Sequence, residues 1–142
     1  MKLPPIEKIP EAFTAIIDNR IKMYTDYAEV VSSDKSKNYL IKWKKNVYFS
    51  NDNSTYWQGY PGYPVLAVLM LQEKLNYNKD VLKYFKNINW NELNKKHNRN
   101  YQNSLEEIIG NLSEKEYIVQ EIEKVYNEVK ELDIEITKKR NL

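Results

Sequence analysis

Residues 51–75 read NDNSTYWQGYPGYPVLAVLMLQEKL, which joins the densest cluster of Tyr, Trp, Gly and Pro to the most apolar run of the chain. Pro64 suits the first turn of a helix, because its missing N–H would have no partner there. The apolar run VLAVLML is far shorter than the about 20 residues that span a bilayer. The stretch therefore predicts a helix from about Tyr63 to Leu75, apolar on nearly all sides and buried at the centre of the core.

The loop before this helix supports two interpretations. Pro61-Gly62 predicts the middle of a type II turn, in which the glycine takes a positive φ. The aromatic side chains either cover the core or form a surface for a partner, because Tyr and Trp contribute strongly to interfaces. If they form a surface, we expect the partner to contact Tyr56, Trp57, Tyr60 and Tyr63.

The chain before the loop predicts a short helix and then a small sheet. Apolar residues at helical spacing indicate a helix over about 5–18, with Pro10 tolerated in its first turn. Residues 20–50 contain four runs rich in β-branched and aromatic residues, RIKMYT, AEVVSS, NYLIKWKK and VYFS. These runs predict an antiparallel β-meander, and the alternation within the third run predicts one buried face.

The chain after the buried helix predicts short helices over 76–112 and one long amphipathic helix over 113–139. Ser113 and Glu116 fit a capping box at the start of that helix. Apolar residues then alternate at spacings of four and three, as in a coiled-coil seam. The seam consists of Ile118, Ile122, Val125, Val129, Leu132 and Ile136. Two interpretations stay open: this helix packs on its own domain, or it binds a partner chain or a second copy.

Together these patterns predict a single α+β domain over residues 1–142. A small antiparallel meander at about 20–50 is expected to pack on the buried central helix within residues 1–75. A helical C-terminal half follows and ends in the long amphipathic helix.

The composition excludes several kinds of chemistry. The chain has no Cys, which excludes disulfides, thiolate zinc sites and a cysteine nucleophile, and its one His, His97, cannot form a multi-histidine metal site. No phosphate-binding loop, dinucleotide fingerprint or hydrolase motif occurs. Asp52 stands among Asn and Ser residues and predicts a turn network rather than a cation site. We therefore expect no catalytic residue, cofactor or metal, and a protein that is not an enzyme.

The sequence also bears on location. The start, MKLPPIEKIPEAF, lacks the apolar region of a signal peptide, and no stretch is long enough to cross a membrane. We expect a cytoplasmic protein with no membrane partner.

Basic and aromatic residues alternate in YLIKWKKNVYF and recur in NKKHNRNYQN. Such residues offer charge for phosphates and rings for bases, so nucleic-acid binding is an alternative function. The net charge of +2 is far from the strongly basic balance of a dedicated nucleic-acid binder. The contacting residues under this alternative are Lys42, Trp43, Lys44, Lys45, Lys95, Lys96 and Arg99.

The order of elements over residues 27–72 resembles the SWIM zinc-binding module. A meander with Tyr39-Leu40-Ile41, a strand ending Tyr48-Phe49-Ser50 and a polar loop precede Val65-Leu66-Ala67-Val68-Leu69 on a helix. The SWIM ligands would fall at Tyr48, Ser50, Gly62 and Pro64, so all four are missing. The resemblance implies a metal-free relative that kept the ββα packing, with the DNA or protein binding associated with SWIM modules. The block GYPGYPVLAVLML is also similar to small uncharacterised archaeal proteins.

The sequence thus predicts a non-enzymatic interaction or assembly protein. It would use the aromatic loop and the amphipathic helix to bind a protein partner or to form a homo-oligomer.

Overall fold

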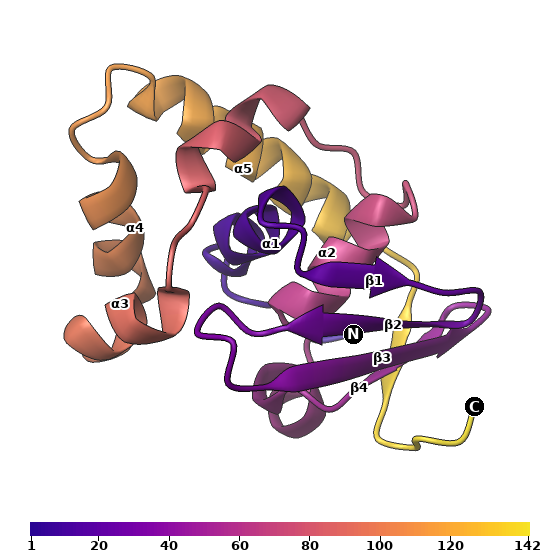
Figure 1. The fold of residues 1–142 in the computed structure, drawn as a ribbon. Coiled ribbons are helices and arrows are strands. Elements are labelled where there is room, and N and C mark those ends of the chain that lie inside the picture. Colours follow the sequence, from indigo (N-terminus) through magenta and orange to yellow (C-terminus); the bar gives the residue numbers. More distant parts are fainter.

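Five strands form one sheet in the computed structural model, which describes residues 1–142 (Figure 1). The strands are β1 (Ile21–Met23), β2 (Tyr27–Val31), β3 (Asn38–Lys44), β4 (Val47–Ser50) and β5 (Glu135–Thr137). They lie in the order β1-β2-β3-β4-β5. The first four pair antiparallel, which confirms the predicted meander, whereas β5 pairs parallel with β4.

The helices pack mainly on one face of this sheet. They are α1 (Lys8–Ile17), the π-helix η1 (Ser54–Gln58), α2 (Tyr63–Leu71), the 3₁₀-helix η2 (Lys79–Phe85), α3 (Trp90–Lys96), α4 (Tyr101–Ile109) and α5 (Lys115–Lys130). Helix α2 contacts β3 and β4, and α1 packs against α2, η2 and α5. None of the helices combines the length and the apolar character that crossing a bilayer requires.

The predicted central helix is confirmed as α2. Its residues Val65 to Leu69 have no solvent-exposed surface, as a helix without a polar face requires. The helix ends at Leu71 rather than at Leu75, because Glu73 takes a left-handed conformation with φ 62°. The side chain of Leu75 nevertheless remains in the core.

The predicted type II turn at Pro61-Gly62 is wrong. Gly62 has φ −71° and ψ 176° and precedes α2 in an extended conformation. The left-handed glycine is Gly59, with φ 76°, where it ends the π-helix η1. Gly62 serves another purpose, because a Cβ atom there would collide with the carboxylate of Asp52.

The long C-terminal helix is present but shorter than predicted. It covers residues 115–130 instead of 113–139, and Ser113 does not cap it, because its hydroxyl donates to the carboxylate of Glu114 at 2.8 Å. The chain turns away after Lys130, and the N–H of Glu135 donates to the carbonyl of Asn46 at 2.8 Å. Residues 135–137 pair with the free edge of β4, which supplies hydrogen bonds that a continued helix would not use.

The predicted seam faces the protein's own core. Ile118, Ile122, Val125 and Val129 are at most 3% exposed, so they leave no apolar stripe on the surface. Leu132 and Ile136 are partly buried against the same core, and Ile136 lies in β5 opposite Tyr48. Of the two interpretations of this helix, the burial of these four side chains matches the one in which α5 packs on its own domain.

Candidate functional site

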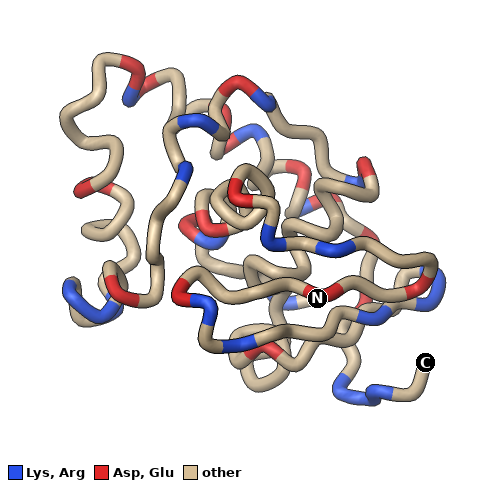
Figure 2. The backbone as a smooth tube through the Cα atoms, in the orientation of Figure 1, with Lys and Arg blue, Asp and Glu red and all other residues tan.

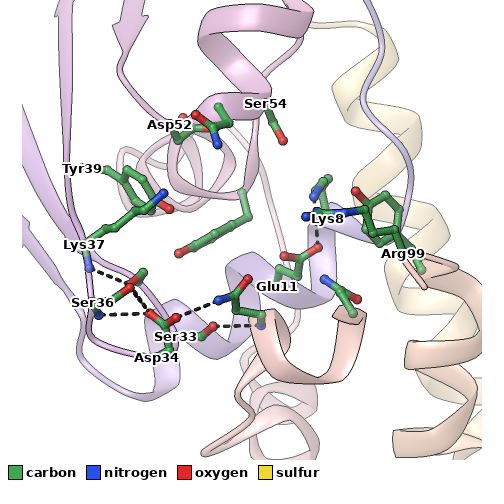
Figure 3. A pocket seen from close by; sticks show the side chains of 16 residues that line it. Lys8, Glu11, Ser33, Asp34, Ser36, Lys37, Tyr39, Asp52, Ser54 and Arg99 are labelled. Atoms are coloured by element: carbon green, nitrogen blue, oxygen red, sulfur yellow. Dashed lines mark hydrogen bonds and ion pairs between the residues drawn. The ribbon is translucent and has the colours of Figure 1, made fainter. Parts of the chain in front are cut away.

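A polar cavity of about 170 Å³ lies between α1, the turn that joins β2 to β3, the start of η1 and the α3–α4 segment (Figure 3). Only 3 of its 16 lining residues are hydrophobic. A cavity kept for packing alone would be apolar, so the concentration of polar groups marks this one as a candidate site.

The floor of the cavity contains a buried ion pair on α1. Lys8 Nζ lies 3.4 Å from Glu11 Oε2, and the two side chains are only 8% and 7% exposed. Lys8 Nζ also lies 4.4 Å from the centre of the Tyr101 ring, a cation–π contact. Burial alone would lower the pKa of Lys8, but the effects of Glu11, Tyr101 and Tyr60 together outweigh burial, so the pKa is raised. Burial raises the pKa of Glu11, and the attraction of Lys8 offsets this only in part.

Asp52 forms one wall through a turn network. Its carboxylate accepts hydrogen bonds from the hydroxyl of Ser50 and from the N–H of Thr55. The hydroxyl oxygen of Thr55 in turn accepts from the N–H of Gly62 at 2.8 Å. The network that the sequence predicted around Asp52 is confirmed, and it fixes the start of α2 against the cavity.

The opposite wall is the turn between β2 and β3, held by Asp34. The Asp34 carboxylate accepts from the hydroxyls of Ser32 and Ser36 at 2.8 and 2.6 Å. It also accepts from Nδ2 of Asn91 at 2.7 Å, which ties the turn to α3. These hydrogen bonds, chiefly those from Ser36, hold the pKa of Asp34 well below its usual range. The Asp34 carboxylate therefore holds the turn in place, and its oxygens already accept hydrogen bonds from the protein.

Two residues of the lining each carry a buried polar atom without a hydrogen-bond partner, the hydroxyl in Tyr63 and Oδ1 in Asn94. Burial raises the pKa of Tyr63 strongly, against the attraction of the nearby Arg20. The Tyr63 ring meets Tyr39 edge-on at 6.4 Å. An unpaired buried polar atom costs about 1–3 kcal/mol, which a bound polar molecule would offset.

The charged side chains of the lining differ in whether they have partners within the protein. The carboxylates of Glu11, Asp34 and Asp52 each have partners in the protein. The exposed cations Lys37 and Arg99 take part in none of the ion pairs of the structure. Figure 3 shows them on opposite sides of the cavity, and Arg99 lies two residues before Tyr101. The lining carries three cations, Lys8, Lys37 and Arg99, and three carboxylates, so its formal charges balance. Lys37 and Arg99 are the cations that no ion pair engages, so an anionic group could contact either of them.

The arrangement has clear chemical capacities. It can bind a small polar molecule, orient it between aromatic rings, and exchange a proton with it through Glu11. No three or more His, Asp or Glu side chains gather in a way that could hold a metal ion.

The aromatic loop that the sequence singled out is divided by the fold. Tyr63 enters the cavity wall. Trp57 points outward and is 67% exposed, and its ring meets that of Tyr56 edge-on at 4.8 Å. Tyr60 is half-buried beneath Lys2, whose Nζ lies 5.9 Å from the ring centre. Tyr63 thus matches the interpretation in which the aromatic residues cover the interior, whereas the exposed Trp57 matches the one in which they form a surface.

The residues proposed to bind nucleic acid also lie in two separate parts of the fold. Lys42, Trp43, Lys44 and Lys45 belong to β3 and its turn, whereas Lys95, Lys96 and Arg99 lie at and beyond the end of α3. Figure 2 shows the two basic groups on opposite sides of the view. Trp43 is half-buried on the inner side of β3, and its ring lies 6.2 Å from that of the buried Tyr48.

The sequence analysis did not identify four residues of the cavity, namely Lys8, Glu11, Asn94 and Tyr101. The one available signal was the pairing of opposite charges three residues apart at the start of an otherwise apolar helix. That pattern is usual on solvated faces, so it does not indicate burial by itself.

The comparisons with known proteins place the chain without assigning an activity to it. No curated protein and no solved structure matches it. The comparisons give no support to the resemblance of residues 27–72 to SWIM modules or to the similarity to archaeal proteins. One family matches residues 1–135, nearly the whole length. On that match, the chain belongs to the family described as uncharacterised conserved protein UCP014422.

Proposed function

We propose that the protein binds a small polar molecule with an anionic group in the cavity between α1, the β2–β3 turn and α3. The observation that supports this most directly is the Lys8–Glu11 pair buried at the floor of a space that remains open. A buried ion pair is a poor source of stability, because the loss of hydration cancels most of the attraction. A pair retained under these conditions fits a binding role.

The size of the cavity limits the ligand. A cavity of roughly 150 Å³ takes a benzene molecule, so about 170 Å³ suits a compound of roughly six to ten non-hydrogen atoms. The unpaired Lys37 and Arg99 favour a carboxylate or a phosphate on that compound. The unpaired Asn94 Oδ1 favours a hydroxyl or amine donor on its body.

A panel of small carboxylates, phosphate esters and neutral polyols in a thermal-shift assay tests this proposal. We expect an anionic member to raise the melting temperature of the wild type, because a ligand that binds only the folded state stabilises it. The double variant Lys8→Met/Glu11→Leu removes the floor without leaving a lone charge, so it should not respond. The surface variant Lys124→Met is the matched control and should respond as the wild type does. Equal responses from the double variant would contradict the proposal.

A second candidate function is binding of a macromolecule by the outward half of the loop. Trp57 is the most exposed large hydrophobic residue, and such residues supply much of the energy at interfaces. Capture of partners with the wild type and with Trp57→Ala tests this function. We expect the variant to lose a partner that the double variant Lys8→Met/Glu11→Leu retains, and equal capture by Trp57→Ala would oppose it.

A further inference from the structure

One face of the sheet carries a row of residues that the strand register brings together. Tyr27 pairs with Lys42, Lys42 with Phe49, and Phe49 with Thr137. The neighbouring row of Ala28, Ile41 and Ser50 is buried in the core. Because side chains alternate along a strand, the first row lies on the opposite face, here called the outer face. Figure 1 shows α2 passing behind β1 and β2, which leaves the outer face of β1–β3 without a helix over it.

Aromatic rings continue along the outer face from one side to the other. Tyr24 and Tyr27 are stacked with ring centres 4.5 Å apart and an interplanar angle of 11°. At the other side, η1 lies over Phe49, with the Tyr56 ring 6.4 Å from it and the Trp57 ring 4.8 Å further on. Tyr24 is 43% exposed and Trp57 67%, so both ends of this series offer ring surface to a ligand.

Lysines lie between and beside these rings. Lys42 stands between Tyr27 and Phe49 in the row, and Lys44 lies on the same face two residues on. Lys138 Nζ lies 5.4 Å from the Trp57 ring centre and 5.5 Å from that of Tyr56. None of the three takes part in an ion pair of the structure.

The acidic residues of the outer face are fewer, and two of them, Asp26 and Glu29, lie close enough to Tyr27 to act on its hydroxyl. Glu29 is paired with Lys22 across β1 and β2, so these two charges offset each other. Glu135 lies in β5 opposite Val47. The remaining balance along the aromatic series is positive, and Lys139 and Arg140 follow Lys138 in the chain.

We propose that the outer face binds single-stranded nucleic acid. Bases stack on Trp57 and on the Tyr24–Tyr27 pair, since every base has a flat face and stacking does not depend on sequence. Phosphates lie against Lys42, Lys44 and Lys138, whose charges no protein carboxylate neutralises. A duplex is a poor fit, because its bases are already stacked on one another and cannot reach the rings. This inference rests on the macromolecular function proposed for the outward half of the loop, and not on the cavity.

Fluorescence anisotropy of the full chain with labelled oligonucleotides tests the proposal. The probes are single-stranded oligo-dT and oligo-U of about 12 nucleotides, within the range that one small domain covers, and a duplex of equal length. We expect the single strands to bind more tightly than the duplex. Their affinity should fall steeply as salt rises from about 50 to 200 mM, because binding releases condensed counterions.

Two variants and two controls decide which surface is responsible. Trp57→Ala should weaken single-strand binding about tenfold or more through lost stacking. Lys42→Gln should weaken it and reduce the salt slope by about 0.7. Lys95→Gln removes a lysine from α3, and Tyr117→Ala removes an aromatic ring from α5 that is 40% exposed. Neither control should change binding, and thermal melts show that each variant is folded.

Four outcomes would overturn the proposal: no single-strand binding at low salt, equal binding of the duplex, equal loss with Lys95→Gln, or complete displacement by polyglutamate at matched charge. The last outcome would assign the outer face to an acidic peptide. If oligonucleotides fail to bind while Trp57→Ala still loses a captured partner, the nucleic-acid inference fails and the macromolecular function stands.

Discussion

Replacing Lys8 by Met is the sharpest test of the buried ion pair. The change leaves the Glu11 carboxylate without its ammonium partner in a place where both side chains are less than a tenth exposed. Breaking such a pair costs about 3–5 kcal/mol, because the remaining charge is buried without compensation. A chain of 142 residues gains about 0.3 kcal/mol/K of entropy on unfolding, so the melting temperature should fall by about 10–17 °C.

The double variant Lys8→Met/Glu11→Leu should recover most of this loss, since two well-packed apolar side chains often replace a buried pair without cost. Thermal and urea unfolding followed by circular dichroism measure both changes. The matched control is Lys124→Met on α5, whose lysine pairs with Glu121 at the same spacing of three residues but is 70% exposed. We expect this control to cost no more than about 0.5 kcal/mol.

The pH dependence of the single variant provides the second half of the test. The pKa of Glu11 is already above its ordinary 4.5 in the folded protein, and loss of Lys8 raises it further. A raised carboxyl pKa favours the folded state at low pH and opposes it as pH rises, so the deficit of Lys8→Met should shrink as the pH is lowered from neutral toward the ordinary carboxyl value of 4.5. The reasoning is refuted if Lys8→Met is as stable as Lys124→Met, or if its deficit stays constant over that range.

Three further changes test other parts of the fold. Asp34→Asn should have a lower free energy of unfolding in urea than the wild type at neutral pH. This difference should become smaller below pH 3.8, because the lowered pKa of Asp34 stabilises the folded state only where the carboxyl of the unfolded chain is ionised. Gly62→Ala should cost about 1–3 kcal/mol through overpacking against Asp52, and a second change, Asp52→Ala, should be less costly in that variant than alone. Ile122→Ala should destabilise the chain by about 2–5 kcal/mol without altering its mass in light scattering, whereas a change of mass would restore the assembly interpretation of α5.

The parts of the fold that depend on neighbouring residues could be predicted from the sequence. Pro64 and the apolar run after it fix α2, because every face of that helix must find an apolar neighbour. The alternation in NYLIKWKK fixes the face that β3 buries, and Ile41 lies fully in the core as that pattern requires. Local sequence patterns are sufficient in both cases.

The end of α5 could not be predicted, because two periodicities overlap there. Val129, Leu132 and Ile136 continue the helical spacing, while Leu132, Ile134 and Ile136 alternate as in a strand. The edge of β4 decides between them, and Asn46, which directly precedes β4, is 87 residues from Asp133 in the chain. No local pattern contains that information.

The cavity could not be predicted for a similar reason. Lys8 and Glu11 are polar residues on an amphipathic helix, where solvent is the ordinary environment. They become buried because α3 and the β2–β3 turn, joined by the bond from Asn91 to Asp34, cover them. That cover depends on three distant segments meeting.

The parallel pairing of β5 with β4 also means that the ribosome synthesises β4 long before the strand that covers its edge. Asp133 comes 87 residues after Asn46, and a ribosome takes roughly 4 to 17 s to add that many residues. During that interval the backbone groups at the edge of β4 have no β5 to pair with. They can pair with any extended segment nearby, including one of another copy on the same polysome. Conditions that stall translation between these points should therefore increase aggregation and the demand for chaperones, even though the finished protein has that edge closed.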